Sequence, residues 1–305
     1  MKTIKLIPLL ILTLLLSGLA NAQNQSGTDS TGLPGDNFSL QGALSLFKEA
    51  ASIEAFETAL NTESNKVNNL DLDGDGNTDY IKVISKADKD NHVFILQAPV
   101  SETESQDIAV IELEKTGTET AMIQIIGDED IYGEEVIVEP DSGEPGAWIE
   151  EPVNSNLSGP NSTIGAVQYD LPIVVNVWLW PSVRFVYAPG YRPWVSPWRW
   201  RHYPGWWRPW RPLSWHVWHP FRAPWHRSFV VVRTHRVVHA HVVYKPFRSS
   251  SVVVRNRHSV AVNNYRVTRS RTTVTGPRGK TTTVKKTTVT GPRGNKATKV
   301  KVRRH

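Results

Sequence analysis

The apolar positions between residues 37 and 139 change their period once along the chain. In the first part, four apolar residues repeat with the i, i+3, i+4, i+7 spacing of one helix face: Leu40, Ala43, Leu44 and Phe47. Ser52 can cap a second short helix that follows. Beyond residue 79 the pattern alternates, as in strands, over 80–84, 93–97, 108–113, 121–126 and 135–138. Two helices before an antiparallel meander predict a small α+β domain over residues 37–139.

The second half of the chain has a different pattern. Residues 140–170 are rich in Pro, Gly, Ser and Asn, which predicts a linker. Residues 171–187 alternate and predict a hairpin around Pro181-Ser182, and residues 229–244 alternate as a strand with a basic face. Between these segments, frequent prolines exclude long helices and central strands. We therefore expect a basic β and irregular region over residues 171–270.

The C-terminal segment, residues 271–305, repeats itself. TTVTGPRGK at 272–280 returns as TTVTGPRGN at 287–295, and two copies are too few for a solenoid. The segment is dense in Lys, Arg and Thr and lacks large apolar residues. Because such a composition does not offset the entropy of ordering the chain, we predict a disordered basic tail.

The first 22 residues have the pattern of a secretory signal peptide. Lys2 and Lys5 precede a short apolar run, and Ala20-Asn21-Ala22 is a small-x-small cleavage site. The polar residues 23–36 then predict a flexible leader. We expect an exported protein, located in the periplasm, on the outer-membrane surface or outside the cell, with no transmembrane span in the mature chain. Export makes cytoplasmic nucleic acid an unexpected partner.

The charges divide the chain into two opposite halves. Residues 1–170 hold 8 basic and all 29 acidic residues, whereas residues 171–305 hold 27 basic residues and no acidic one. The basic half could contact an external anionic surface, or it could dock on the acidic domain. The absence of cysteine from the sequence excludes disulfides, thiol nucleophiles and cysteine zinc sites.

The sharpest motif is an aspartate-rich loop after the second predicted helix. The sequence DLDGDGNTD places oxygen donors, and a glycine at the sharp turn, where the first nine positions of a helix–loop calcium site require them. The predicted ligands are Asp71, Asp73, Asp75, Asn77 and Asp79. Hard oxygen donors favour Ca²⁺ over zinc or copper, so we predict that calcium clamps the acidic domain.

This loop resembles the EF-hand and dockerin type, with one departure. Position 12 is Lys82, which cannot bind Ca²⁺, and the exit from the loop is strand-like. Another segment must supply the missing oxygens, or the site is weak. The alternative interpretation is a solvated Asp/Gly turn without an ion.

A second candidate site combines tryptophan with arginine. Eleven of the 12 tryptophans lie between Trp178 and Trp225, interleaved with Arg and Pro. Arg binds anionic groups and stacks on indole, and Trp prefers membrane interfaces, which together suit lipid, lipopolysaccharide or acidic polysaccharide. The predicted contact residues are Arg192, Trp194, Trp198, Arg199, Trp200, Arg201, Trp206, Trp207, Arg208, Trp210 and Arg211. The alternative is that these side chains form an internal interface with the acidic domain.

Catalytic motifs are missing from the sequence. No nucleophile elbow, H-E-x-x-H, phosphate-binding loop or dinucleotide fingerprint occurs. Glu112 and Glu114 share one strand face and could mimic a glycosidase pair, but we expect them to be solvated. His235, His239 and His241 lie in a strand-like segment, where a solvated basic face is expected rather than a metal site.

Four stretches resemble a family of uncharacterised secreted proteins from Bacteroidetes-type bacteria. They are VNNLDLDGDGNTDYIKVI, FILQAPVSETESQDIAVIELEKTG, IIGDEDIYGEEVIVEP and VNVWLWPSVRFVYAPGYRPWVSPWRW. The resemblance spans about residues 38–270 and implies export and a two-part layout, with no catalytic residue. We predict a non-enzymatic envelope or extracellular binding protein. The alternatives are a periplasmic folding or inhibitor module with the basic half docked internally, and a polysaccharide hydrolase.

Overall fold

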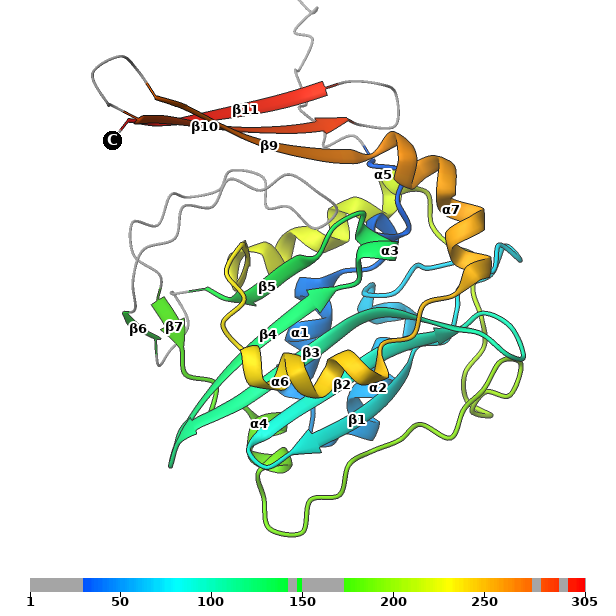
Figure 1. Cartoon of the computed structure of the whole chain (residues 1–305). Coiled ribbons are helices and arrows are strands. Elements are labelled where there is room, and N and C mark those ends of the chain that lie inside the picture. Colours follow the sequence, from blue (N-terminus) through cyan, green and yellow to red (C-terminus); the bar gives the residue numbers. More distant parts are fainter. Residues whose placement is uncertain (1–29, 142–146, 150–172, 276–280, 291–295, 305) are drawn as a thin grey trace, which may run out of the picture.

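The computed structural model of the chain (Figure 1) describes residues 30–141, 147–149, 173–275, 281–290 and 296–304. The predicted signal peptide and most of the predicted linker lie outside these residues. The end of the predicted flexible leader lies within them and is packed: Leu33 and Asp36 are both 2% exposed. Asp36 accepts hydrogen bonds from Ser30, Thr31 and the Gly32 backbone, which explains why this polar segment is ordered.

Two capped helices open the fold. They are α1 (Leu40–Glu49) and α2 (Ile53–Leu60), and the N-cap serines, Ser39 and Ser52, accept a backbone N–H from the first turn of each. The apolar face predicted for α1 is fully buried, as are Ile53, Phe56 and Leu60 of α2. Both helices are confirmed.

A six-stranded antiparallel sheet forms the centre of the molecule, in the order β1-β2-β3-β4-β5-β8. Its strands are β1 (Lys82–Asp88), β2 (Asn91–Pro99), β3 (Ser105–Gly117), β4 (Thr120–Gly127), β5 (Val136–Pro140) and β8 (Phe229–Val232). The predicted meander is therefore confirmed over β1 to β5, and the fold class is α+β. The sixth strand comes from the basic half.

The basic half covers both edges of this meander. At one edge β8 pairs with β5, with Val231 opposite Val138. At the other edge, residues 194–196 run beside β1: the Ser85 N–H donates to the Trp194 carbonyl at 2.7 Å, and the Ser196 N–H donates to the Val83 carbonyl at 3.1 Å. Edge strands present unpaired backbone groups; here β8 pairs with the edge of β5, and residues 194–196 pair with the middle of β1.

The other short elements lie before, between and after the sheet strands in the sequence. They are η1 (Pro34–Asn37), η2 (Glu63–Asn65), α3 (Glu129–Tyr132), β6 (Ala147–Ile149), β7 (Ile173–Val175), α4 (Pro181–Val186), α5 (Trp215–Trp218), η3 (His219–Arg227), α6 (Val238–Tyr244), η4 (Lys245–Phe247) and α7 (Val252–Asn264). The hairpin predicted around Pro181-Ser182 is wrong, because Pro181 begins α4, and proline suits the first turn of a helix. The strand predicted over 229–244 ends at Val232, and α6 replaces its second half.

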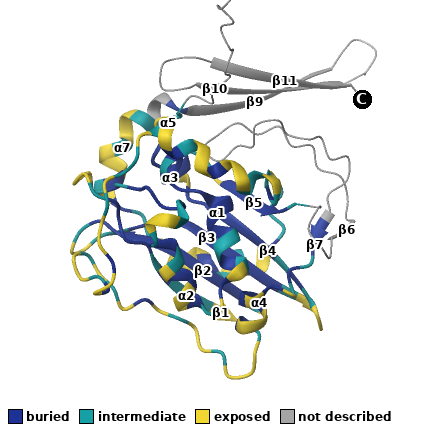
Figure 2. Ribbon diagram, turned by 180° about the vertical axis from the view of Figure 1, so that it is seen from behind, coloured by how far each residue is buried: buried dark blue, intermediate teal, exposed yellow. Residues whose placement is uncertain are grey.

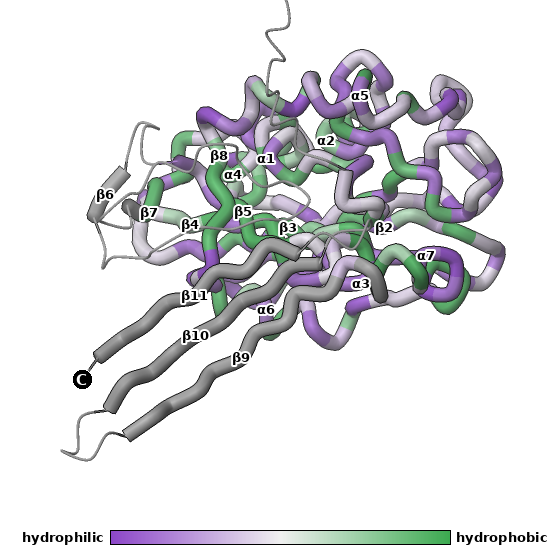
Figure 3. The backbone as a smooth tube through the Cα atoms, turned by 90° about the horizontal axis from the view of Figure 1, so that it is seen from above, coloured by the Kyte–Doolittle hydropathy of each residue, from purple (hydrophilic) through white to green (hydrophobic). Residues whose placement is uncertain are grey.

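Helices cover both faces of the sheet, as Figures 1 and 2 show from opposite sides. On one face α1 and α2 pack with α4, and the larger apolar core includes Phe47, Phe94 and Ile111. On the other face α6 lies across β1, β2 and β3 over a smaller core around Val93, Val110 and others. Apolar segments follow the central strands between these helices (Figure 3).

The repeated tail also differs from its prediction. In place of a disordered segment, β9 (Arg266–Thr275), β10 (Thr281–Thr290) and β11 (Lys296–Arg304) form a three-stranded antiparallel sheet. Alternating Thr and Val favour strands, and each Gly-Pro-Arg-Gly segment falls between two strands in the sequence. The lack of apolar bulk predicts disorder, whereas the β-propensity of Thr and Val favours strands.

Candidate functional site

The predicted calcium loop brings three of its five predicted ligands together. One carboxylate oxygen each from Asp71, Asp73 and Asp75 lies within 4.8 Å of the others. The turn is held by its own carboxylates: Asp71 accepts the Gly76 N–H at 3.0 Å, and Asp73 accepts the Asp75 N–H at 3.1 Å. Gly76 adopts a φ of 83°, as predicted for the sharp turn.

Asp79 and Asn77 take other roles. The Asp79 carboxylate is buried and accepts the Leu72 N–H at 2.6 Å, closing the loop from inside. Burial, reinforced by the three neighbouring carboxylates, raises the pKa of Asp79 well above its usual value, although the bond from Leu72 opposes this shift. Asn77 contributes its backbone N–H to Asp75 at 2.8 Å. Lys82 lies in β1, and its Nζ contacts the Ser105 hydroxyl at 3.4 Å.

The basic half also reaches this loop. The Trp200 indole donates to the Asp73 carboxylate at 3.4 Å, and both the N–H and the hydroxyl of Thr78 donate to the Trp210 carbonyl. The guanidinium of Arg257 lies against Gly74, where an added Cβ would come within 1.6 Å of Nη1. A protein cation therefore already lies beside the three carboxylates.

The Trp/Arg segment, residues 192–211, separates its two residue types. All five predicted contact arginines are exposed: Arg192, Arg199, Arg201, Arg208 and Arg211. Four of the six tryptophans are only partly exposed, Trp207 is 4% exposed and Trp206 is 53% exposed. The arginines thus face solvent, while most of the tryptophans attach the segment to the domain. Figure 2 shows the exposed positions along this loop.

Glu57 on α2 anchors the start of this segment, a role that no local pattern indicates. The side chain is 2% exposed and accepts four hydrogen bonds. The donors are the Tyr80 hydroxyl at 2.8 Å, the Val83 N–H at 2.8 Å, the Ser196 hydroxyl at 2.9 Å and the Trp194 indole at 3.0 Å. Trp207 packs edge-on against Tyr80 nearby, with ring centroids 5.2 Å apart. Trp194 and Trp207 are therefore structural, contrary to a purely external binding role.

Arg222 is a buried cation in the part of the basic half that the structure describes. It is 2% exposed, and its Nη1 contacts the Asp36 carbonyl at 3.5 Å, while the Trp218 indole donates to the same carbonyl at 2.9 Å. Burial lowers the pKa of Arg222 and raises that of the Asp36 carboxyl. Arg248 makes a more exposed pair, with its Nε 2.7 Å from the Asp128 carboxylate.

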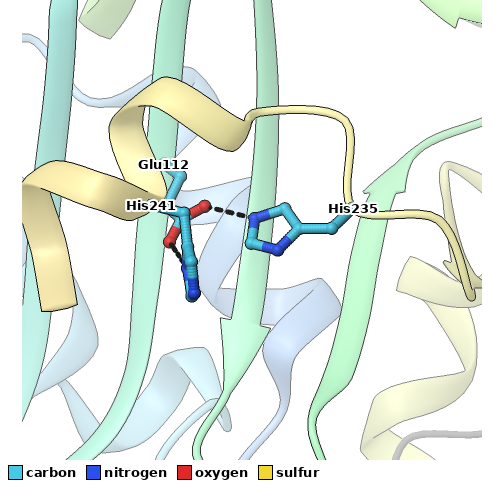
Figure 4. Close-up of side chains that lie close together, drawn as sticks. All are labelled: Glu112, His235 and His241. Atoms are coloured by element: carbon cyan, nitrogen blue, oxygen red, sulfur yellow. Dashed lines mark hydrogen bonds and ion pairs between the residues drawn. The ribbon is translucent and has the colours of Figure 1, made fainter.

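Glu112 meets His235 and His241 beneath α6 (Figure 4), and Glu114 meets His239 of the same helix. Glu112, which is fully buried, lies 2.6 Å from His235 Nε2 and 2.7 Å from His241 Nδ1. Glu114, 5% exposed, lies 3.1 Å from His239 Nδ1. The prediction of solvated glutamates is wrong, because α6 covers the strand face that carries Glu112 and Glu114. The predicted solvated histidine face is wrong for His235 and His241, which are mostly covered, whereas His239 is exposed as predicted. The alternation of β3 indicated the shared face but not the helix above it.

Comparisons with models of protein families, with curated proteins and with solved structures gave no match. Function is therefore inferred from the geometry of the chain itself. Within the described ranges, no helix combines the length and the apolar character needed to cross a membrane.

Proposed function

We propose that the protein is an exported, non-enzymatic binding protein that attaches to anionic surfaces of the cell envelope. The partner that fits best is a lipid or lipopolysaccharide surface with clustered phosphates. One observation carries the proposal: along residues 192–211 the arginines are exposed, and most tryptophans hold the segment to the domain.

This arrangement presents charge without leaving the segment free to move. The backbone of residues 194–196 is bonded to β1, and the Trp210 carbonyl is bonded to Thr78 at the other end of the segment. Ion pairs elsewhere in the described chain use other cations, such as Arg236 and Arg248. A backbone that is already fixed loses less conformational entropy on binding than a free segment would, and guanidinium binds phosphate bidentately.

The test is cosedimentation of the mature chain, residues 23–305, with anionic phospholipid vesicles at low and at physiological salt. The informative variant replaces Arg192, Arg199 and Arg211 with glutamine. Because each basic residue near an anionic surface contributes about 1 kcal/mol, we expect binding to weaken about 100-fold. Neutral vesicles should not bind the protein at either salt concentration.

A charge-matched control separates a defined face from general attraction. It replaces three other exposed arginines with glutamine: Arg184, Arg227 and Arg255. If both triple variants lose the same affinity, net charge alone drives binding and the proposed face is wrong. If the unmodified chain binds neither vesicle, surface attachment itself is refuted.

We further propose that Ca²⁺ stabilises the acidic loop. Three clustered carboxylates support it, since hard oxygen donors suit Ca²⁺ and a loop with few ligands suits millimolar affinity. Chelation should then lower the melting temperature, and Asp73→Asn should abolish the difference, whereas Asp88→Asn, at the exposed end of β1, should preserve it. An unchanged melting temperature in millimolar calcium would leave Arg257 as the cation that balances the loop.

The alternative of a folding or inhibitor module also has support in the contacts described above. The basic half supplies β8, covers β1 and places Arg222 and Trp218 against Asp36. For that reason the binding tests use the full mature chain, because residues 171–305 alone would lack their packing partners. Both proposals require this docking, and vesicle binding distinguishes them.

A further inference from the structure

We propose that Glu112, His235 and His241 form a zinc-binding site that fastens α6 to the sheet. The three residues come from separate elements: Glu112 from β3, His235 from the connection after β8, and His241 from α6. One donor atom from each lies within 4.8 Å of the other two. Figure 4 shows both imidazole rings directed at the single carboxylate.

The donor set selects the metal. Two imidazole nitrogens and one carboxylate oxygen are typical of zinc sites that keep one position for water. Ca²⁺ and Mg²⁺ prefer oxygen donors, so this site and the aspartate loop would bind different ions. The two candidate sites are thus chemically distinct and can be tested separately.

The present spacing is close to what zinc requires. His235 Nε2 and His241 Nδ1 lie 2.6 and 2.7 Å from the Glu112 oxygens. Tetrahedral zinc, with bonds of about 2.0–2.1 Å, separates its ligands by about 3.3 Å. Each of these two nitrogen–oxygen pairs therefore needs to separate by less than about 1 Å. The rings centre 4.4 Å apart at 74°, so two different edges face the carboxylate without stacking.

The three side chains differ in their exposure to solvent. The Glu112 side chain is fully buried, whereas the side chains of His235 and His241 are 20% and 16% exposed. The two imidazoles therefore form the solvent-exposed side of the site, where water would complete the coordination of an ion. The carboxylate at the base is held in place by the strand that carries it.

The surrounding charges favour a cation. Glu114, two residues along the same strand face, is also buried, and Glu135 lies close enough to act on His235. Arg236, the nearest cation in sequence to His235, is paired with Glu139 at 3.2 Å. Zinc would replace the protons that now bridge the imidazoles and Glu112, and each bound imidazole would carry its proton on the remote ring nitrogen.

Titration of the metal-free mature chain with Zn²⁺, followed by calorimetry and by melting temperature, tests the proposal. We expect one zinc per chain and a rise in melting temperature of about 5–10 °C at a hundred times the dissociation constant. Co²⁺ used as a probe should give the visible absorption of a four-coordinate ion. Failure to bind one zinc at micromolar concentrations would overturn the proposal.

The variants distinguish this site from scattered surface histidines. His241→Gln and His235→Gln should each weaken zinc binding at least 100-fold, and Glu112→Gln should do the same if it folds, as judged by circular dichroism. The matched control is His239→Gln: this histidine is on the same helix and 75% exposed, and it contacts Glu114 instead. Unchanged binding in the His235 and His241 variants would refute the site, as would an equal loss in the His239 variant.

Discussion

Glu57→Gln is the substitution that best tests how the two halves of the chain are joined. The carboxylate accepts two hydrogen bonds on each oxygen: Tyr80 and Ser196 donate to Oε1, and Val83 and Trp194 donate to Oε2. Glutamine keeps the shape but replaces one oxygen with an NH₂ group. The amide oxygen can still accept the Val83 and Trp194 N–H groups, but the Tyr80 and Ser196 hydroxyls must then turn round and accept from the NH₂ group.

The expected cost follows from this count. Four charge-assisted bonds become neutral, two of them with their direction reversed, and each change of this kind is worth about 1 kcal/mol. We therefore expect the free energy of unfolding to fall by about 4 kcal/mol, a large share of the 5–15 kcal/mol of an ordinary domain. Glu54→Gln on the exposed face of the same helix is the control, and it should change stability by less than about 0.5 kcal/mol.

Urea unfolding of the mature chain, followed by tryptophan fluorescence, provides the measurement. Trp194→Phe removes a single donor from Glu57, so the two substitutions should couple by about 1 kcal/mol in a double-mutant cycle. If Glu57→Gln lowers the free energy of unfolding no more than Glu54→Gln does, the Glu57 carboxylate does not hold the segment. If the two effects simply add, Trp194 and Glu57 do not interact as described.

Three further predictions concern packing, pH and backbone conformation. Trp207→Ala should cost about 3–5 kcal/mol because that ring is buried, whereas the adjacent Trp206→Ala, at a 53% exposed ring, should cost under about 1 kcal/mol in the same urea assay. Burial lowers the pKa of His92 to about 4, so the unfolded chain binds the proton first as the pH falls. The free energy of unfolding should therefore drop by about 2 kcal/mol from pH 7 to 5 through this residue, and His92→Gln should remove that part of the pH dependence. Gly133→Ala should lower the melting temperature, because φ is 75° and the new Cβ would lie 2.8 Å from Tyr265, while Gly205→Ala, with open space around it, should not.

The acidic half of the fold was predictable because its signals are local. Helix caps, the i, i+3, i+4 spacing and the strand alternation around 80–138 all act within a few residues, and they gave the correct elements. The basic half was not predictable in the same way. Its valines at 238–243 alternate with polar residues, which favours a strand, but packing over Val93 and Val110 makes the segment a helix.

The candidate sites divide along the same line. Asp71, Asp73 and Asp75 are close in sequence, so their convergence could be predicted from spacing alone. Glu112 and His235 are 123 residues apart, and nothing in either local pattern indicates that they meet. The glutamates of β3 stood out only as charged residues on a face shared with Val110. Charged residues on an otherwise apolar strand face are the local signal of a buried polar site.

The covered edges of the meander have a consequence for how the protein matures. A chain synthesised from its N-terminus completes β1 through β5 before residues 194–196 and 229–232 exist, so the half-made sheet has open edges on both sides. Any copy that stops or is cleaved in this interval exposes the unpaired backbone groups of two edge strands. Such a copy can pair edge to edge with its neighbours. The completed chain covers β1 and β5 with its own residues and so opposes this polymerisation. A fragment ending near residue 190 should form filaments where the whole protein does not.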